Sequence, residues 1–168
     1  SFATASFFGL GAYAGAVGQV HGVPMVLAWM IGGLTAALFA WALGLAILHL
    51  KGHYFAIASL IVAEVLREII NSATGITGGG MGLNIPILRW EVDAQARLFY
   101  YAMFAVSLAA LAATAYVVAR PLGFGLKCIK QNEDAADMIG INTTLYKTAA
   151  FSLSAVFVGI AGGFYASW

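Results

Sequence analysis

The sequence predicts an all-α bundle of membrane-spanning helices. Of its 168 residues, 62% are hydrophobic and only 9% are charged, whereas a soluble domain carries about 25% charged residues because its surface must hold water. Residues 1–50 contain no Lys, Arg, Asp or Glu, although one bilayer crossing needs only about 20 apolar residues. We therefore expect a single membrane-spanning domain over residues 1–168, with about five crossings.

Apolar segments long enough to supply these crossings follow one another along the chain. They are residues 2–20, 25–50, 53–70, 98–119 and 148–168. Turn-forming residues at 21–24 and 51–52 separate the first three. The third segment is unusual because Glu64, Arg67 and Glu68 lie inside it, and charges at this depth are costly unless they are paired or wet. Because the sequence begins and stops inside apolar segments, we expect a fragment of a longer chain.

Small residues recur every four positions in these segments, which places them on one helix face. The stripes consist of Gly11 and Gly15; Gly18 and Gly22; Gly32, Ala36, Ala40 and Gly44; Ala105, Ala109 and Ala113; and Ala155, Gly159 and Gly163. No hydrophobic force acts between helices in lipid, so close backbone approach along such stripes packs them together. The sequence therefore predicts a tightly packed bundle.

Basic residues near the ends of the crossings predict the orientation of the chain. The polar segment 120–147 contains four Lys or Arg residues, whereas the segment 71–97 contains two, of which Arg89 is one. We therefore expect 120–147 in the cytoplasm and 71–97 on the outer side. Lys51 falls on the cytoplasmic side by alternation, which agrees with this assignment.

Composition and motif content exclude several classes of function. The net charge is +1, and phosphate binding needs clustered Lys and Arg, so we expect no nucleic-acid partner. One cysteine, Cys128, cannot form an internal disulfide or a multi-cysteine metal site. Neither a Gly-x-Ser-x-Gly nor a His-Glu-x-x-His motif occurs in the sequence. We therefore assign no catalytic residue and no metal ligand.

The cytoplasmic segment carries the most specific local pattern. Residues 125–139 predict one amphipathic helix, with Leu126 and Ile139 among the apolar residues near one face. Gly140 suits the left-handed position that ends a helix, and Asn142 suits the cap of the next one. Such a helix can merely join two crossings, or it can pass motion from a soluble partner into the bundle.

Blocks of this sequence resemble a known family in their residues and in their order. The longest, 120–147, combines a Pro-x-Gly turn, a Glu-x-Ala-Ala-x-x-x-Gly-Ile segment and a Tyr-Lys helix start; its matching residues are Glu133, Ala135, Ala136, Gly140, Ile141, Tyr146 and Lys147. The other blocks are residues 7–13, 52–57 leading to 64–67, and 77–83 before Pro86. Nearly the whole chain thus resembles LivM-type permease subunits of bacterial branched-chain amino-acid ABC importers.

The resemblance implies a transport subunit of the bacterial inner membrane that moves branched-chain or other hydrophobic amino acids. Its implied partners are a LivH-type second permease subunit, two cytoplasmic ATP-binding subunits, a periplasmic substrate-binding protein and membrane lipid. The sequence lacks a Gly-x-x-x-x-Gly-Lys-Ser/Thr loop, so we expect ATP and Mg on the partner subunits and no cofactor on this chain. A permease for urea or short amides is an alternative, and a non-transport scaffold or an intramembrane enzyme is the alternative class.

The resemblance also implies candidate site residues. Those expected to contact the ATPase are Glu133, Asp134, Ala135, Ala136 and Gly140. The outer-face loop that meets the binding protein contains Thr77, Gly78, Gly79 and Gly80. Apart from the resemblance, the charges inside the third crossing make Glu64 and Arg67 candidates for the translocation path, together with Tyr54 and Phe55.

Two interpretations of the charged third crossing remain open. Glu64 and Arg67 are three residues apart and share a helix face. They can form a pair that joins two helices, or they can line a passage, where they would offer partners to the ammonium and the carboxylate of an amino acid.

Overall fold

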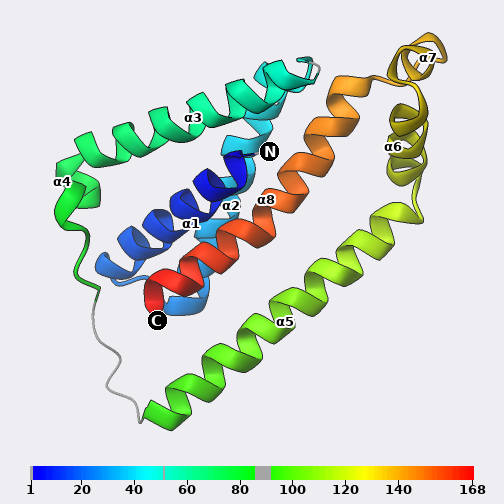
Figure 1. The fold of residues 1–168 in the computed structure, drawn as a ribbon. Coiled ribbons are helices and arrows are strands. Elements are labelled where there is room, and N and C mark those ends of the chain that lie inside the picture. The colour runs from blue at the N-terminus through cyan, green and yellow to red at the C-terminus, as the bar shows by residue number, and fades with distance from the viewer. Residues whose placement is uncertain (1, 51, 86–91) are drawn as a thin grey trace.

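The computed structural model describes residues 2–50, 52–85 and 92–168, and this part of the chain is helical and contains no strand (Figure 1). Its elements are α1 (Ala3–Val20), α2 (Met25–Ile47), α3 (His53–Ser72), α4 (Thr74–Thr77), the 3-10 helix η1 (Gly79–Met81), α5 (Val92–Val118), α6 (Pro121–Gln131), α7 (Glu133–Met138) and α8 (Thr143–Ser167). The predicted all-α fold is confirmed, and each predicted crossing is a helix. Lys51, Pro86 and Arg89, on which parts of the sequence analysis rest, lie outside the described residues.

Three helices of the described residues are long and apolar enough to cross a membrane: α2, α5 and α8. The other two predicted crossings, α1 and α3, form helices but are not among these three. α1 has only 18 residues and includes Thr, Ser, Tyr and Gln side chains, and α3 carries the three charges of the unusual segment. The expectation of about five crossings thus corresponds to five helices, of which three meet the requirements of length and hydropathy.

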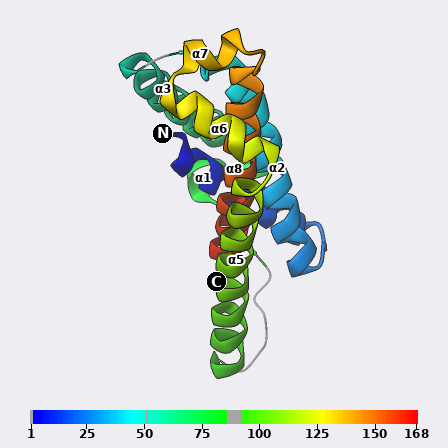
Figure 2. The same cartoon turned by 90° about the vertical axis from the view of Figure 1, so that its right-hand side faces the viewer.

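α1, α2 and α8 form the packed centre of the molecule, and their backbones meet at glycines (Figures 1 and 2). A methyl group added at Gly11 of α1 would lie 2.2 Å from the carbonyl oxygen of Gly159 on α8. One added at Gly32 of α2 would lie 2.6 Å from the carbonyl oxygen of Gly11. The stripes of small residues on these helices therefore pack as the sequence predicts, except that Gly22 lies past the end of α1 with a φ of +83°.

Polar and aromatic contacts close one end of this centre. The hydroxyl of Ser167 on α8 accepts hydrogen bonds from Gln19 Nε2 of α1 at 2.7 Å and from Trp29 Nε1 of α2 at 2.9 Å. The same hydroxyl donates to the carbonyl oxygen of Gly163 at 2.9 Å. The ring of Trp29 stacks on that of Phe164 at 3.7 Å between centroids. One serine thus joins three helices.

α5 lies against the centre through large side chains. Phe99 is 5% exposed and contacts the rings of Trp29, Phe164 and Trp168, but the apolar window of α5 has no buried residue. Figure 2 shows α5 extending past the other helices. Close packing of the stripe formed by Ala105, Ala109 and Ala113 was predicted, and within this chain the prediction is wrong for Ala105 and Ala109, which are exposed because α5 packs against the centre through Phe99, Ala102 and Val106.

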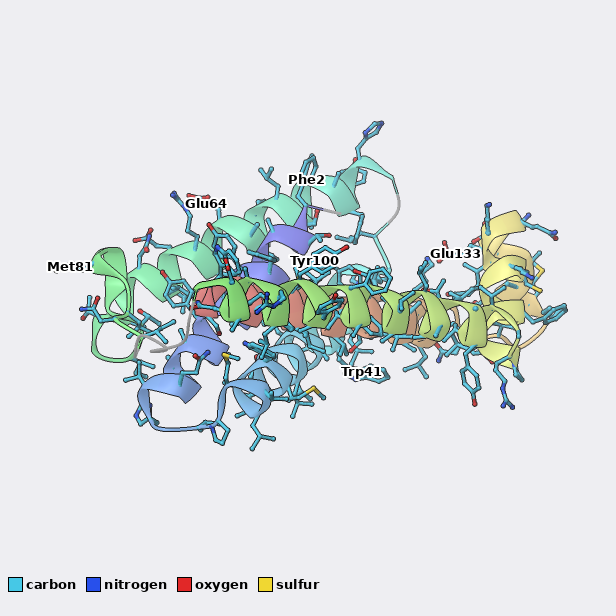
Figure 3. The ribbon with its side chains drawn as sticks, turned by 90° about the horizontal axis from the view of Figure 1, so that it is seen from below. Phe2, Trp41, Glu64, Met81, Tyr100 and Glu133 are labelled. Carbon is cyan, nitrogen blue, oxygen red and sulfur yellow. The ribbon has the colours of Figure 1, made fainter. Side chains whose placement is uncertain are left out.

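The two ends of the molecule carry different polar segments. α6 and α7 lie at one end, and α4 lies at the other (Figure 1). Figure 3 shows Glu133 of α7 and Met81 of η1 at opposite ends. This arrangement agrees with the expectation that residues 120–147 and 71–97 lie on opposite sides of a membrane.

Candidate functional site

The predicted amphipathic helix 125–139 is two helices, α6 and α7, which break at Asn132. Asn132 has an extended backbone with φ −157° and ψ 114°, and its side chain accepts a hydrogen bond from Ala135 N at 3.1 Å. An asparagine side chain that bonds the backbone in this way starts a new helix in place of continuing the old one. The acidic residues Glu133 and Asp134 directly after Asn132 are the signal by which this start could have been found.

The turn between α7 and α8 has the predicted geometry. Gly140 has a φ of +85°, the left-handed conformation that favours glycine. Its N–H donates to the carbonyl oxygen of Asp137 at 3.0 Å. Asn142 then caps α8, because its side chain accepts from Leu145 N at 3.0 Å. The predicted roles of Gly140 and Asn142 in the backbone are confirmed.

An ion pair attaches α7 to the start of α8. Lys147 Nζ lies 2.5 Å from Glu133 Oε1, and the two side chains are 21% and 28% exposed. Lys147 Nζ also lies 3.5 Å from the carbonyl oxygen of Leu48, just after α2. Glu133 is thereby directed toward the bundle rather than toward solvent.

A second contact holds α6 against α8. Gly125 of α6 faces the ring of Tyr146, and a methyl group at Gly125 would lie 2.3 Å from Cε1 of that ring. Both attachments involve the first turn of α8, so α6 and α7 are each joined to the start of that helix.

The residues expected to contact an ATPase differ in their solvent exposure. Asp134, Ala135 and Gly140 are exposed, whereas Ala136 is only 2% exposed. Met138 and Ile139 were not predicted as contact residues, but they are 87% and 70% exposed at the tip of α7. Ile139, which was predicted to share one helix face with Leu126, instead lies at the end of a separate helix, α7.

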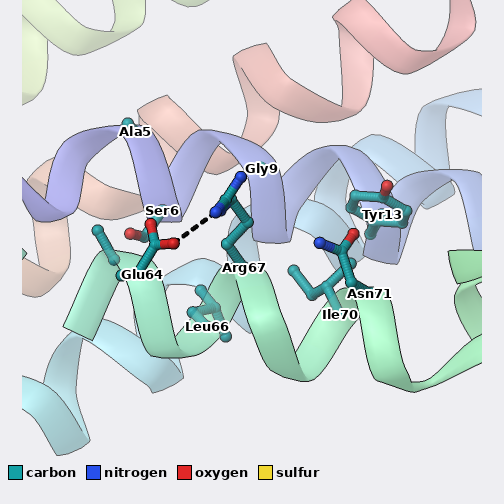
Figure 4. Close-up of a pocket in the computed structure, with 10 residues that line it drawn as sticks. Ala5, Ser6, Gly9, Tyr13, Glu64, Leu66, Arg67, Ile70 and Asn71 are labelled. Carbon is teal, nitrogen blue, oxygen red and sulfur yellow. Dashed lines mark hydrogen bonds and ion pairs between the residues drawn. The ribbon is translucent and has the colours of Figure 1, made fainter. Parts of the chain in front are cut away.

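A cavity of about 310 Å³ lies between α1 and α3 (Figure 4). Its lining residues are Ala5, Ser6, Gly9, Tyr13, Ala63, Glu64, Leu66, Arg67, Ile70 and Asn71. Glu64 and Arg67 form an ion pair on α3, with side chains 65% and 66% exposed. The cavity therefore combines a carboxylate, a guanidinium, polar groups and a mainly aliphatic wall.

The other two candidates for the translocation path lie elsewhere on α3. Tyr54 is 74% exposed, and Phe55 packs against the core formed by α1, α2 and α8. Both belong to the first turn of α3, about 15 Å along the helix from Glu64 at 1.5 Å per residue. The structure therefore brings Glu64 and Arg67 together at one cavity and leaves Tyr54 and Phe55 away from it.

The predicted outer-face loop forms a compact turn around a buried threonine. Thr77 is 8% exposed, and its Oγ1 lies 2.6 Å from the Ile70 carbonyl oxygen and 2.9 Å from that of Ala73. The N–H of Gly79 donates to the same hydroxyl at 3.2 Å. Gly78 and Gly79 have φ values of +71° and +57°, and Gly80 lies within η1. Thr77 thus stabilises the turn from inside.

Comparison with known proteins places the chain among transport proteins. The sequence model of the family described as branched-chain amino acid transport system / permease component matches residues 1–168. The chain is 27% identical over 190 aligned residues to the high-affinity branched-chain amino acid transport system permease protein LivM of Salmonella typhimurium strain LT2, and 28% identical over 190 to that of Escherichia coli strain K12. Each alignment covers 96% of this chain and 44% of the relative, so the chain spans less than half the length of these relatives. No solved structure matches it.

Proposed function

The chain belongs to the family of permease components of branched-chain amino acid transport systems, and from this premise we propose that it is the membrane part of an ATP-driven importer. Its cargo is a branched-chain or another hydrophobic amino acid, and its location is the bacterial inner membrane. Support comes from the match over residues 1–168 and from three helices that can cross a membrane.

ATP hydrolysis takes place on other subunits in this proposal. The sequence has no phosphate-binding loop with the required lysine, so two cytoplasmic ATPase subunits supply the energy. A second permease subunit of the LivH type completes the path, and a periplasmic binding protein delivers the amino acid at the end that carries α4 and η1. ATP and Mg bind to the ATPase subunits.

The attachment of α7 to the bundle is the observation that carries the transport mechanism. Asp134, Ala135 and Met138 face solvent on α7 and offer a surface to an ATPase. On the inner side of α7, Glu133 pairs with Lys147, which also lies next to the end of α2. A displacement of α7 by the ATPase therefore reaches α8 and α2 directly, and these are the helices of the packed centre.

Copurification and uptake test this function. The full-length chain is produced with its neighbouring subunits, copurified, and reconstituted in vesicles with the binding protein. ATP-dependent uptake is then measured for labelled leucine, isoleucine, valine, urea and acetamide. We expect ATPase subunits to copurify and leucine-like amino acids to accumulate only with ATP. Uptake of urea or acetamide alone would replace the proposed cargo, and the absence of any ATPase partner would refute the importer.

A further inference from the structure

We propose that the cavity between α1 and α3 binds one α-amino acid with an aliphatic side chain on its way through the membrane. The site consists of Ser6 and Gly9 on α1 and of Glu64 and Arg67 on α3 (Figure 4). This proposal rests on the proposed function, which leaves the place of the cargo open.

The hydroxyl of Ser6 is the first indication of a ligand. Ser6 is 8% exposed and lines the cavity, and its Oγ has no hydrogen-bond partner. A buried hydroxyl without a partner is costly, and more so where no water competes. Other hydroxyls in these helices bond the carbonyl four residues earlier, as Ser107 does with Met103. Ser6 Oγ is itself covered, so in this proposal the wall of the cavity shifts slightly when the ligand bonds this hydroxyl.

Thr148 shows that an unpartnered hydroxyl alone does not make a site. Its Oγ1 is also buried without a partner, but Thr148 is fully buried against Gly44 of α2. The Cγ2 atom of Thr148 would lie only 2.9 Å from a methyl group at Gly44. No ligand can enter there, whereas Ser6 adjoins about 310 Å³ of open volume.

The two charges at the cavity match the two charges of an amino acid. The carboxylate of Glu64 can accept from an ammonium group, and the guanidinium of Arg67 can bind a carboxylate with two parallel hydrogen bonds. Their own ion pair joins residues three apart on one helix, and both side chains are about two-thirds exposed. Such pairs are weak, so a ligand can exchange with them without disrupting the fold.

The rest of the cavity selects the side chain of the ligand by size and polarity. Ala63, Leu66 and Ile70 contribute aliphatic wall from α3. A volume of 310 Å³ corresponds to about ten water molecules at ~30 Å³ each, enough for a single small amino acid. The cavity lies in the half of α3 that leads to α4, which is the end where the binding protein delivers cargo in the proposed function.

Gly9 provides a way to fill the cavity without disturbing the bundle. Nothing lies within 4 Å of the position that a Cβ atom would occupy at Gly9. A Gly9→Leu side chain therefore enters the open volume, and it removes no charge and no hydrogen bond. Loss of binding in this variant would result from occupied space alone.

Protection of an introduced cysteine from labelling tests the site. In the full-length complex, Cys128→Ser removes the one cysteine of these 168 residues, and Asn71→Cys then places a thiol at the exposed edge of the cavity. The matched control, Ser107→Cys, lies on α5 at a separate groove. Labelling by a small methanethiosulfonate reagent is followed with and without L-leucine, in vesicles with the binding protein, and ATP-driven uptake is measured in parallel.

We expect leucine to slow labelling of Asn71→Cys at least about fivefold and to leave Ser107→Cys unchanged. Leucinamide lacks the carboxylate and 4-methylpentanoate lacks the ammonium, so neither should protect. Gly9→Leu and Glu64→Gln should each abolish protection in complexes that still copurify.

Each other result decides against one of the two proposals. Leucine uptake without protection of Asn71→Cys would overturn the site and leave the importer standing. Protection without uptake of leucine would support the site and refute the cargo assigned to the importer. Protection of Ser107→Cys in place of Asn71→Cys, or equal protection by leucinamide and 4-methylpentanoate, would also overturn the site.

Discussion

Two regions of this molecule are packed in different ways. One is the centre formed by α1, α2 and α8, and the other is the outlying helix α3. In the centre, glycines bring backbones into direct contact, as Gly11 does with Gly159. α3 carries Glu64 and Arg67 and meets α1 across a cavity. Close backbone contacts tolerate little change, whereas a cavity with an exchangeable ion pair can open and refill. The difference indicates that the centre resists change more than its edge, which is where the proposed cargo site lies.

The largest effect is expected from substitutions at the glycine contacts. Gly11→Ala directs a methyl group at the backbone of Gly159, which cannot move aside, so the helices must separate. We expect a loss of about 1–3 kcal/mol in stability, measured as the midpoint of thermal unfolding in detergent. Gly9→Ala, two residues away in open space, is the matched control and should leave stability unchanged. Equal loss of stability in both variants would show that the close contact between Gly11 and Gly159 does not hold the centre together.

A smaller effect, on coupling, is expected at the ion pair between Glu133 and Lys147. Glu133→Lys and Lys147→Glu each place like charges together, and each should lower ATP-dependent uptake about tenfold, equivalent to ~1.4 kcal/mol. The double variant restores the pair in reverse and should recover most of the uptake. If uptake is lowered in the single variants and is lowered equally in the double variant, Glu133 acts on a partner subunit rather than on α8.

Ser167→Ala should weaken the polar contact that joins the three central helices. It leaves the donors of Gln19 and Trp29 without their shared acceptor, and hydrogen bonds between helices in membranes average about 0.6 kcal/mol, with a maximum near 1.7. We expect a loss of about 1 kcal/mol in thermal unfolding. Ser107→Ala, whose hydroxyl bonds only its own helix, should show no loss, and a similar loss there would contradict the role given to Ser167.

The smallest effect is expected on α5, where the stripe of small residues is exposed. Ala109→Leu adds volume at an exposed position of α5. We expect a change within about 0.5 kcal/mol in thermal unfolding of the isolated chain. A loss as large as that of Gly11→Ala would place this stripe in a packed contact after all.

The helices and several of their ends could be predicted from the sequence, because they depend on residues that are close together along the chain. Apolar length placed helices at each expected crossing, and Gly140 and Asn142 have the backbone roles that their side chains favour. The break at Asn132 was missed although its capping signal is local, because the apolar pattern of 125–139 continues across it.

The candidate site depended far more on tertiary structure. Glu64 and Arg67 could be paired from their spacing along one helix. Nothing in the spacing showed that Ser6, 58 positions before Glu64 in the sequence, would line the same cavity. Nor could it show that Glu133 would turn toward Lys147, since the two belong to helices whose relative position is set by the turn at Gly140.

The sequence by itself determined the helical class, the membrane setting and the identity of the stripes that can pack, because each depends on composition or on spacing within a helix. Only the tertiary structure decided which stripes met and which did not. Gly11 and Gly159 are in contact while Ala109 is exposed, although both stripes have the same spacing. The reason is that spacing determines which residues share a helix face but not which face meets a neighbour, and α5 meets the centre through Phe99, Ala102 and Val106.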